Sequence, residues 1–161
     1  MEAMILTVSE LLSQLPARGA LIGLDVGTKR IGVATSDPDR RLASPVETIT
    51  RRTFAVDAAR ILALVAERKA VGFILGLPIN MDGSEGPRAQ GVRAFARNLA
   101  RLSQLPLAFW DERLSTAAVE RALIAHDVSR ARRAKVIDQH AAAFILQGAL
   151  DSLVRATSPT G

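Results

Sequence analysis

The stretch LIGLDVGTKRIGVATSD, residues Leu21–Asp37, decides the fold. Its first part, Leu21–Val26, is apolar at successive positions, which is typical of a strand covered on both faces. Gly27-Thr28 then predicts a tight turn, and Arg30–Ser36 predicts a second strand that pairs with the first as a hairpin. A single carboxylate, Asp25, interrupts this hairpin close to its turn.

The rest of the chain alternates between strand-like and helix-like segments. Leu42–Ile49 contains Pro45 and predicts a third strand at or near a sheet edge, where a missing N–H group is tolerated. Beyond it, apolar residues recur with a helical period and are interrupted by short apolar runs. Helices are expected from near Thr53, Pro87 and Ser115 and over Asp138–Val154, and strands over Val71–Leu75 and Leu107–Trp110. We therefore expect one α/β domain, with a mixed central sheet, an early antiparallel strand meander and helices on its faces.

The two ends of the chain receive expectations of their own. Residues 1–19 are expected to form a helical extension, residues 20–155 the main domain, and residues 156–161 a flexible tail. The first residues lack the basic start and continuous apolar run of a secretory signal. The sequence has no cysteine, which excludes disulfides and thiolate zinc sites, and no apolar run long enough for a membrane span. We expect a cytoplasmic protein with no membrane partner.

The charge balance favours a polyanionic partner. The 21 Lys and Arg residues exceed the 16 Asp and Glu residues, and the formal net charge is +5. Basic side chains that neutralise phosphates release counterions from nucleic acid, which favours binding. Aromatic residues make up only 4% of the chain, so no platform for stacking single strands is expected.

Acidic residues stand at the predicted ends of several elements. Asp25 follows one buried strand, Asp111 and Glu112 follow another, and Asp138 opens the last predicted helix. Each also has a structural interpretation: Asp25 suits a turn, Glu112 a surface ion pair, and Asp138 a helix N-cap. Together they form a set of oxygen ligands suited to hard divalent cations. Two such ions activate water and stabilise the leaving oxygen in phosphodiester hydrolysis.

Four blocks of sequence, taken in order, resemble the YqgF/RuvX family of pre-16S rRNA nucleases. The first is Gly23–Ala34, and the second runs from Gly76-Leu77-Pro78 through Asn80–Glu85. The third is Asp111–Thr116. The fourth is Asp138 followed by Ala141, Ala142, Ile145, Leu146 and Gln147. The resemblance covers roughly residues 21–151, and the four blocks together are far more specific than any one of them.

The resemblance implies an RNase H-like fold, related to that of Holliday junction resolvases, and a role in maturing the 5′ end of 16S rRNA. It implies a Mg²⁺ or Mn²⁺ site made by Asp25, Glu112 and Asp138, with Asp25 as the central ligand. Asp111 is kept as a fourth catalytic candidate, because neighbouring strand residues face opposite ways and the alternation does not choose between the pair. The expected partner is precursor rRNA or a pre-ribosomal particle, and the expected assembly a monomer or weak homodimer.

Polar and basic residues near these acids are the candidates for binding substrate. Such side chains position a nucleic acid through its phosphates. The candidates are Lys29, Arg30, Asn80, Arg113, Arg130, Arg132 and Arg133.

Three other functions remain open from the sequence. The first is a nuclease of this fold that acts on branched DNA, for which a two-fold dimer would match the symmetry of a junction. The segment Asp25–Thr28 followed by a hairpin also resembles the phosphate-binding opening of sugar kinases and chaperone ATPases, which need two such domains. The third is a non-catalytic ribosome-assembly factor that keeps the fold.

Overall fold

The computed structural model describes residues 5–114 and 130–157, and within the last helix the side chains of residues 136–154. Six strands form one mixed sheet in the order β1-β6-β5-β2-β3-β4. The strands are β1 (Ile5–Leu6), β2 (Ala20–Val26), β3 (Arg30–Ser36), β4 (Ala43–Thr50), β5 (Ala70–Leu77) and β6 (Leu107–Asp111). The helices are α1 (Val8–Gln14), α2 (Phe54–Arg68), α3 (Pro87–Leu102), the short 3₁₀ turn η1 (Glu112–Leu114) and α5 (Arg130–Thr157). The α/β class is confirmed.

The hairpin expected from the opening stretch is the centre of the sheet. β2 and β3 are antiparallel, with Asp25 opposite Gly32, and the Gly27 N–H closes the turn by donating to the Arg30 carbonyl at 2.9 Å. β4 continues the meander antiparallel to β3, and its Pro45 lies at a register shift in the ladder. That shift and the position of β4 at the sheet edge explain how a strand tolerates a residue without an N–H donor.

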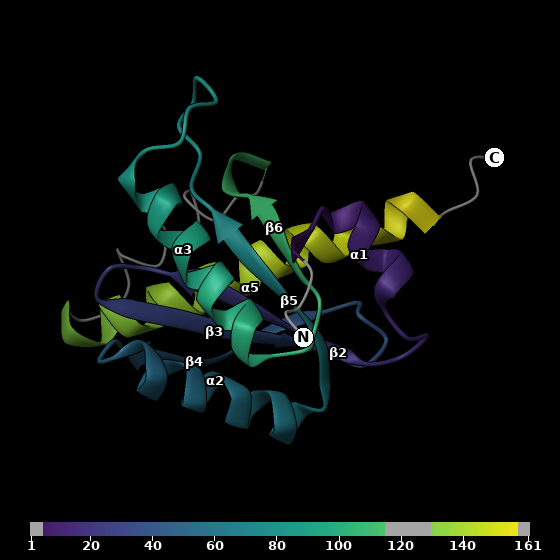
Figure 1. The fold of residues 1–161 in the computed structure, drawn as a ribbon, viewed down its shortest axis with the longest axis horizontal. Coiled ribbons are helices and arrows are strands. Elements are labelled where there is room, and N and C mark those ends of the chain that lie inside the picture. Colours follow the sequence, from purple (N-terminus) through teal and green to yellow (C-terminus); the bar gives the residue numbers. More distant parts are fainter. Residues whose placement is uncertain (1–4, 115–129, 158–161) are drawn as a thin grey trace.

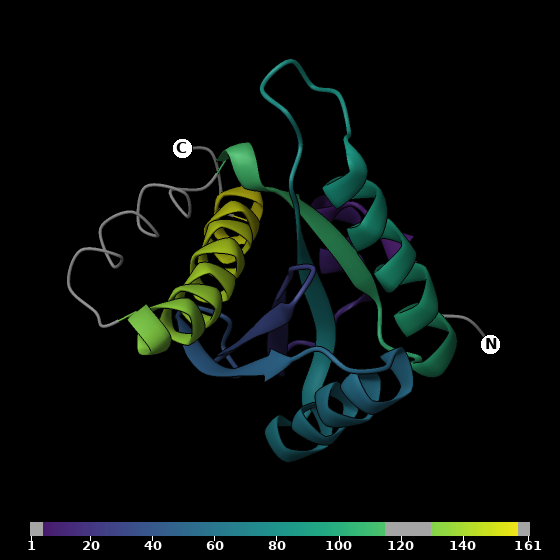
Figure 2. The same cartoon turned by 90° about the vertical axis from the view of Figure 1, so that its left-hand side faces the viewer.

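Helices cover both faces of the sheet. α2 and α3 pack on one face, and α5 crosses the other (Figures 1 and 2). The two faces bury separate apolar clusters, one that includes Ile61 and Phe95 beneath α2 and α3, and one that includes Leu146 and Leu150 on α5. None of the helices in the described ranges is long and apolar enough to cross a membrane.

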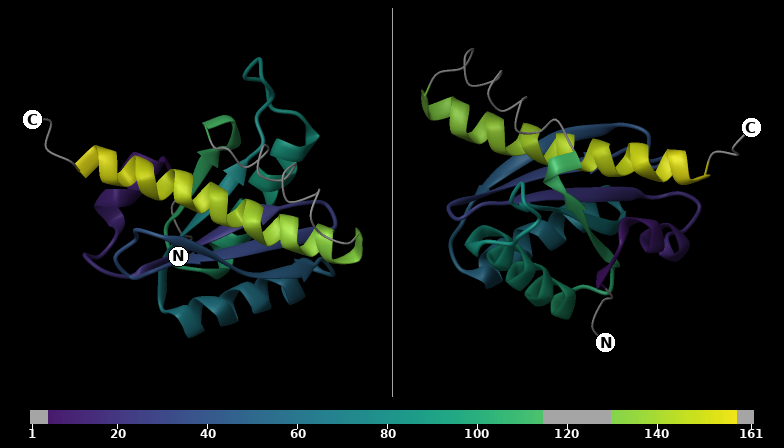
Figure 3. Two further views of the ribbon diagram at one scale, coloured as in Figure 1. Left: turned by 180° about the vertical axis from the view of Figure 1, so that it is seen from behind. Right: turned by 90° about the horizontal axis from the view of Figure 1, so that it is seen from above.

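Glycines on three neighbouring strands bring α5 close to the sheet. A Cβ atom at Gly32 of β3 would overlap the backbone carbonyl of Asp138, and one at Gly23 of β2 would lie 2.8 Å from the Cβ of Leu146. On β5 a Cβ at Gly76 would lie 2.5 Å from Cδ1 of Ile145 on α5. The helix therefore lies across β3, β2 and β5 (Figure 3). Larger residues at these three positions would not permit so close an approach.

A short segment ahead of the central hairpin, Ile5–Leu6, is built into the same sheet. β1 pairs in parallel with β6, so it extends the edge of the sheet beyond the family-like region. Thr7 caps α1 through a reciprocal pair of hydrogen bonds with Glu10. Leu11 of this helix is fully buried in the α5-side cluster. Residues Val8–Gln14 thus form a helix that contributes to the core.

The last helix begins earlier than the sequence predicted. α5 starts at Arg130, so Asp138 lies in its third turn and is not an N-cap. The segment 130–137 is rich in Arg and Ala, which are strong helix formers, but it lacks the apolar stripe by which a helix is recognised. A favourable capping residue was therefore mistaken for a helix start. The helix predicted from Ser115 lies outside the described residues.

Candidate active site

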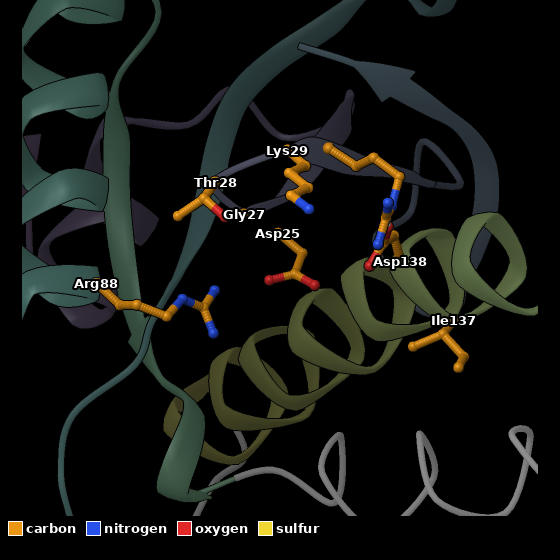
Figure 4. Close-up of a pocket in the computed structure, with 8 residues that line it drawn as sticks. Asp25, Gly27, Thr28, Lys29, Arg88, Ile137 and Asp138 are labelled. Atoms are coloured by element: carbon orange, nitrogen blue, oxygen red, sulfur yellow. The ribbon is translucent and has the colours of Figure 1, made fainter.

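Asp25 occupies a buried position near the end of β2. Its side chain is on the α5 face, because Gly23, two residues earlier, contacts Leu146 of that helix. The residue is only 6% exposed, and burying an ionised carboxylate is costly unless a cation or hydrogen-bond donors compensate it. It lines a cavity of about 370 Å³, into which Lys29 and Arg88 also extend (Figure 4).

Asp138 reaches the same cavity from α5. Its Oδ2 atom accepts a hydrogen bond from Nε of Arg30 at 2.6 Å, and the pair is partly buried. Gly32 is responsible for this approach, since it lies opposite Asp25 in the strand ladder and directly beneath the Asp138 backbone. Two of the predicted acids, Asp25 and Asp138, are thus brought together although 113 positions separate them in the chain (138 minus 25).

The acidic pair at the end of β6 divides between two environments. Trp110 packs against Gly148 of α5, so alternation turns Asp111 toward the opposite face of the sheet. Asp111 accepts hydrogen bonds from Nη2 of Arg113 at 2.7 Å and from Nε at 3.1 Å. These bonds to the Arg113 guanidinium hold the pKa of Asp111 below its ordinary value.

Glu112 has the other orientation. Its Oε1 atom is buried and lies against Gly76, the residue that follows the last paired position of β5 beside β2. The last paired residues of the two strands are Leu24 of β2 and Leu75 of β5. The next residue on β2, beside Gly76 of β5, is Asp25. Glu112 is therefore the member of the pair that lies toward Asp25, while Asp111 is engaged by Arg113.

The donor set suits a hard cation, although the acids do not form a closed cage. In residues 5–114 and 130–157, no three carboxylate or imidazole groups lie close enough together to surround one ion. Asp138 is engaged by Arg30. The carboxylates of Asp25 and Glu112 offer the oxygen donors that Mg²⁺ and Mn²⁺ prefer. The residues present therefore fit a divalent cation, and Asp138 would have to leave Arg30 to join them.

A second cavity, of about 460 Å³, adjoins the first. It lies between the loop after β5 and the start of α3, and its lining includes Asn80, Met81, Pro87, Arg88, Glu112 and Arg113. Nη1 of Arg113 donates to the Asn80 carbonyl at 3.4 Å, so the same guanidinium that holds Asp111 also contacts the loop.

The predicted substrate-binding residues are distributed unevenly around these cavities. Lys29 and Arg30 line the acidic cavity, and Asn80 and Arg113 line the second one. The backbones of Arg130, Arg132 and Arg133 belong to the first turn of α5, and their side chains lie outside the described part of the helix.

Sequence reasoning missed Arg88, which lines both cavities. It stands at the start of α3 after Pro87, and the available signal was a basic residue at a predicted helix start just beyond the loop Asn80–Glu85. Nothing in the sequence placed that helix start beside Asp25, because the two are distant in the chain and meet only through the pairing of β2 with β5.

Comparison with solved structures defines the class of fold. Thermus thermophilus RuvC in complex with a Holliday junction substrate matches with a TM-score of 0.55 at 13% identity, over 87% of this chain and 98% of that one. A second structure of the same resolvase matches with a TM-score of 0.50, over 85% and 96%. The protein therefore has the RNase H-like fold of these resolvases.

Sequence comparison identifies the family. The chain belongs to the RuvX family, whose sequence model, described as a Holliday junction resolvase, matches residues 19–152. A Rhodopseudomonas palustris protein named "Putative pre-16S rRNA nuclease" is 71% identical over all of this chain and 99% of its own length. A Nitrobacter winogradskyi protein of the same name is 70% identical over the full length of both. The predicted family is confirmed, and the chain is a nuclease, a hydrolase of ester bonds.

Proposed function

We propose that this nuclease depends on Mg²⁺ or Mn²⁺ and cleaves precursor 16S rRNA during maturation of its 5′ end and ribosome biogenesis. The observation that carries the proposal is the buried carboxylate of Asp25, in a cavity shared with Asp138 and next to the strand end that precedes Glu112. The names of the close relatives support the RNA substrate. The proposed partner is precursor rRNA, alone or within a pre-ribosomal particle.

Three acids are proposed to hold the cation, with Asp25 as the central ligand between Glu112 and Asp138. A bound divalent ion supplies an activated water and stabilises the leaving oxygen of the phosphodiester. To serve as a ligand, Asp138 would give up its hydrogen bond with Arg30, and the Arg30 guanidinium would then be available to a substrate phosphate. Asp111 is left out of the ligand set, because Arg113 already engages it.

The substrate-binding proposal follows the cavities. Lys29 and Arg30 are proposed to bind the phosphate that is cleaved, since both line the acidic cavity. Asn80 and Arg113 are proposed to contact the strand beyond it, in the second cavity. The first turn of α5, with Arg130, Arg132 and Arg133, is proposed to bind the backbone farther away.

The setting of this activity is proposed to be the cytoplasm, with the protein as a monomer or weak homodimer. A sequence without cysteine is compatible with a reducing compartment. The basic net charge supports association with an RNA-rich particle.

The test is metal-dependent cleavage by the wild type and by Asp25→Asn. The substrates are an RNA that spans the 5′ leader of 16S rRNA and a four-way DNA junction, each with Mg²⁺, with Mn²⁺ or with chelator. We expect the wild type to cut the RNA only with metal, and Asp25→Asn to lose cleavage at least about a hundredfold while it stays folded. Asp39→Asn is the matched control, because Asp39 is a half-exposed acid paired with Arg18 at the β3–β4 turn.

The same assay examines the second candidate function, resolution of branched DNA. The description of the matching family and the structural likeness to RuvC favour it. Cleavage of the junction in preference to the RNA would replace the rRNA proposal. Absence of metal-dependent cleavage on both substrates would contradict the enzymatic proposal and leave an assembly factor.

A further inference from the structure

We propose that the second cavity receives the nucleotide next to the cleaved phosphate, and that Arg88 binds the phosphate that links this nucleotide onward along the strand. The inference rests on the proposed nuclease function. It adds a path for the strand, from the acidic cavity past Arg88 into the cavity beneath the loop after β5.

The position of Arg88 is the first observation. Among the residues described as lining the two cavities, Arg88 alone is common to both. It is an exposed residue in the first turn of α3, and its guanidinium extends toward Asp25 in Figure 4. A phosphate that passes from one cavity to the other must therefore come near this guanidinium.

The pairing of the neighbouring arginines is the second observation. Arg30 is bound to Asp138, Arg93 makes two hydrogen bonds to Glu85, and Arg113 makes several to Asp111. Within the described parts of the chain, Arg88 has no carboxylate within ion-pair distance. Its planar fork of donors therefore remains available for a phosphate.

The lining of the second cavity favours a base. Pro78, Ile79, Met81 and Pro87 give it apolar walls, and Asn80 adds a polar group at the edge. Unpaired bases of RNA bind in such places through their faces and through hydrogen bonds to their edges. Apolar walls with polar side chains at the rim, among them Asn80 and Arg113, are thus suited to a nucleotide that has left its helix.

The loop that presents Met81 is fixed by its own hydrogen bonds. The Asn80 N–H donates to the Ser84 carbonyl at 2.9 Å, and the Gly83 N–H donates to the Asn80 carbonyl at 2.8 Å. The Ser84 hydroxyl donates to Asp82 at 2.6 Å. Met81 is nevertheless 90% exposed at the tip. A held loop with an exposed thioether offers an apolar surface to a base at little cost in ordering.

The experiment is a double-mutant cycle that combines protein variants with substrate variants. Binding of the RNA oligonucleotide is measured by fluorescence anisotropy in the presence of a metal chelator, so that no cleavage occurs. Single phosphates of the RNA are replaced, one at a time, by neutral methylphosphonates. We expect one replacement, one or two linkages from the mapped cut, to weaken wild-type binding about tenfold. In Arg88→Gln, which itself binds about tenfold more weakly, the same replacement should have less than about a twofold effect.

Arg97→Gln is the matched control, because Arg97 is an exposed arginine on the same helix and lines neither cavity. It should leave every methylphosphonate effect unchanged. Cleavage by the wild type without any phosphate coupled to Arg88 would overturn this inference and leave the proposed function standing. No cleavage by the wild type would overturn the proposed function and this inference with it.

A second cycle tests the base. An abasic nucleotide beside the coupled phosphate should weaken wild-type binding about fivefold, and Met81→Ala should remove most of that loss. Met81→Ala is not expected to affect folding, since the side chain is almost fully exposed. Equal losses in the wild type and Met81→Ala would exclude a base against this loop.

Discussion

At the scale of single residues, the two adjacent acids at the end of β6 show how a shift of one position along the chain changes the surroundings of a carboxylate. The ring of Trp110 packs against Gly148 of α5, which fixes the face of the sheet toward which each residue at the end of β6 points. Asp111 then meets Arg113, and Glu112 lies against Gly76 toward Asp25. Two adjacent carboxylates thus have different surroundings: Asp111 binds Arg113, and Glu112 lies on the side of the sheet where Asp25 lies.

This division predicts opposite outcomes for two conservative substitutions. Glu112→Gln should lower metal-dependent cleavage at least about a hundredfold with little change in the free energy of unfolding. Asp111→Asn should keep most of the cleavage and destabilise the protein at neutral pH by at most about 1 kcal/mol, because its ion pair is partly exposed. Cleavage assays and urea unfolding measure the two effects.

The stability effect of Asp111 should also depend on pH. Arg113 lowers the pKa of Asp111 in the folded state, so its stabilisation is complete above the ordinary pKa of an aspartate and is lost as the pH falls through the lowered value. The difference in unfolding free energy between wild type and Asp111→Asn should therefore shrink from pH 7 to about pH 3. A difference that stays constant over this range would contradict the assignment of the ion pair.

Local sequence predicted some of these residues and not others. Asp25 stood out because an acid beside a glycine turn interrupts a buried strand. The choice between Asp111 and Glu112 depended on the packing of Trp110 on a helix far along the chain. The position of Arg88 beside Asp25 depended on the pairing of β2 with β5, which no local pattern in the sequence indicates.

At the scale of elements, the approach of α5 to the sheet decides where Asp138 lies. Gly32→Ala should push the Asp138 backbone away, because the added methyl would overlap its carbonyl and backbone cannot rotate aside. We expect a loss of about 1–3 kcal/mol in unfolding free energy, and a loss of cleavage even in the folded fraction. Urea unfolding and cleavage at a temperature well below the melting point measure the two effects separately.

Gly91→Ala is the control for that substitution. Gly91 lies within α3, and a Cβ there would meet nothing within 4 Å. Alanine should therefore stabilise the protein by about 0.5–1 kcal/mol, as expected for a glycine inside a helix, and leave cleavage unchanged. Equal behaviour of the two variants would show that the close contact at Gly32 does not position α5.

The elements themselves were largely predictable because their periodicity is strong. β3 and the start of α3 were predicted at the residues where they occur, and Pro45 correctly indicated an edge strand. The start of α5 was wrong because its first turns are polar and basic, without a stripe to recognise. The pairing of β1 with β6 had no local signal, since a strand of two residues carries no period.

At the scale of the whole molecule, the basic charge should govern binding. The acidic cavity alone contributes three basic residues, Lys29, Arg30 and Arg88. Each phosphate of single-stranded RNA that a basic residue neutralises makes the plot of log association constant against log salt concentration steeper by about 0.7. We expect the logarithm of the RNA association constant to fall against the logarithm of salt concentration with a slope of about −2 or steeper. Anisotropy titrations at several salt concentrations measure it, and binding independent of salt would contradict a phosphate-directed site.

The order in which the chain supplies the site also has a consequence for its timing. Asp25 is made early, Glu112 later, and Asp138 arrives with the helix that lies across Gly32, Gly23 and Gly76. A domain generally folds as a unit during synthesis, and a nascent chain that lacks α5 also lacks Asp138, one of the three proposed ligands. We therefore expect cleavage activity to appear only after this last helix has left the ribosome and packed on the sheet.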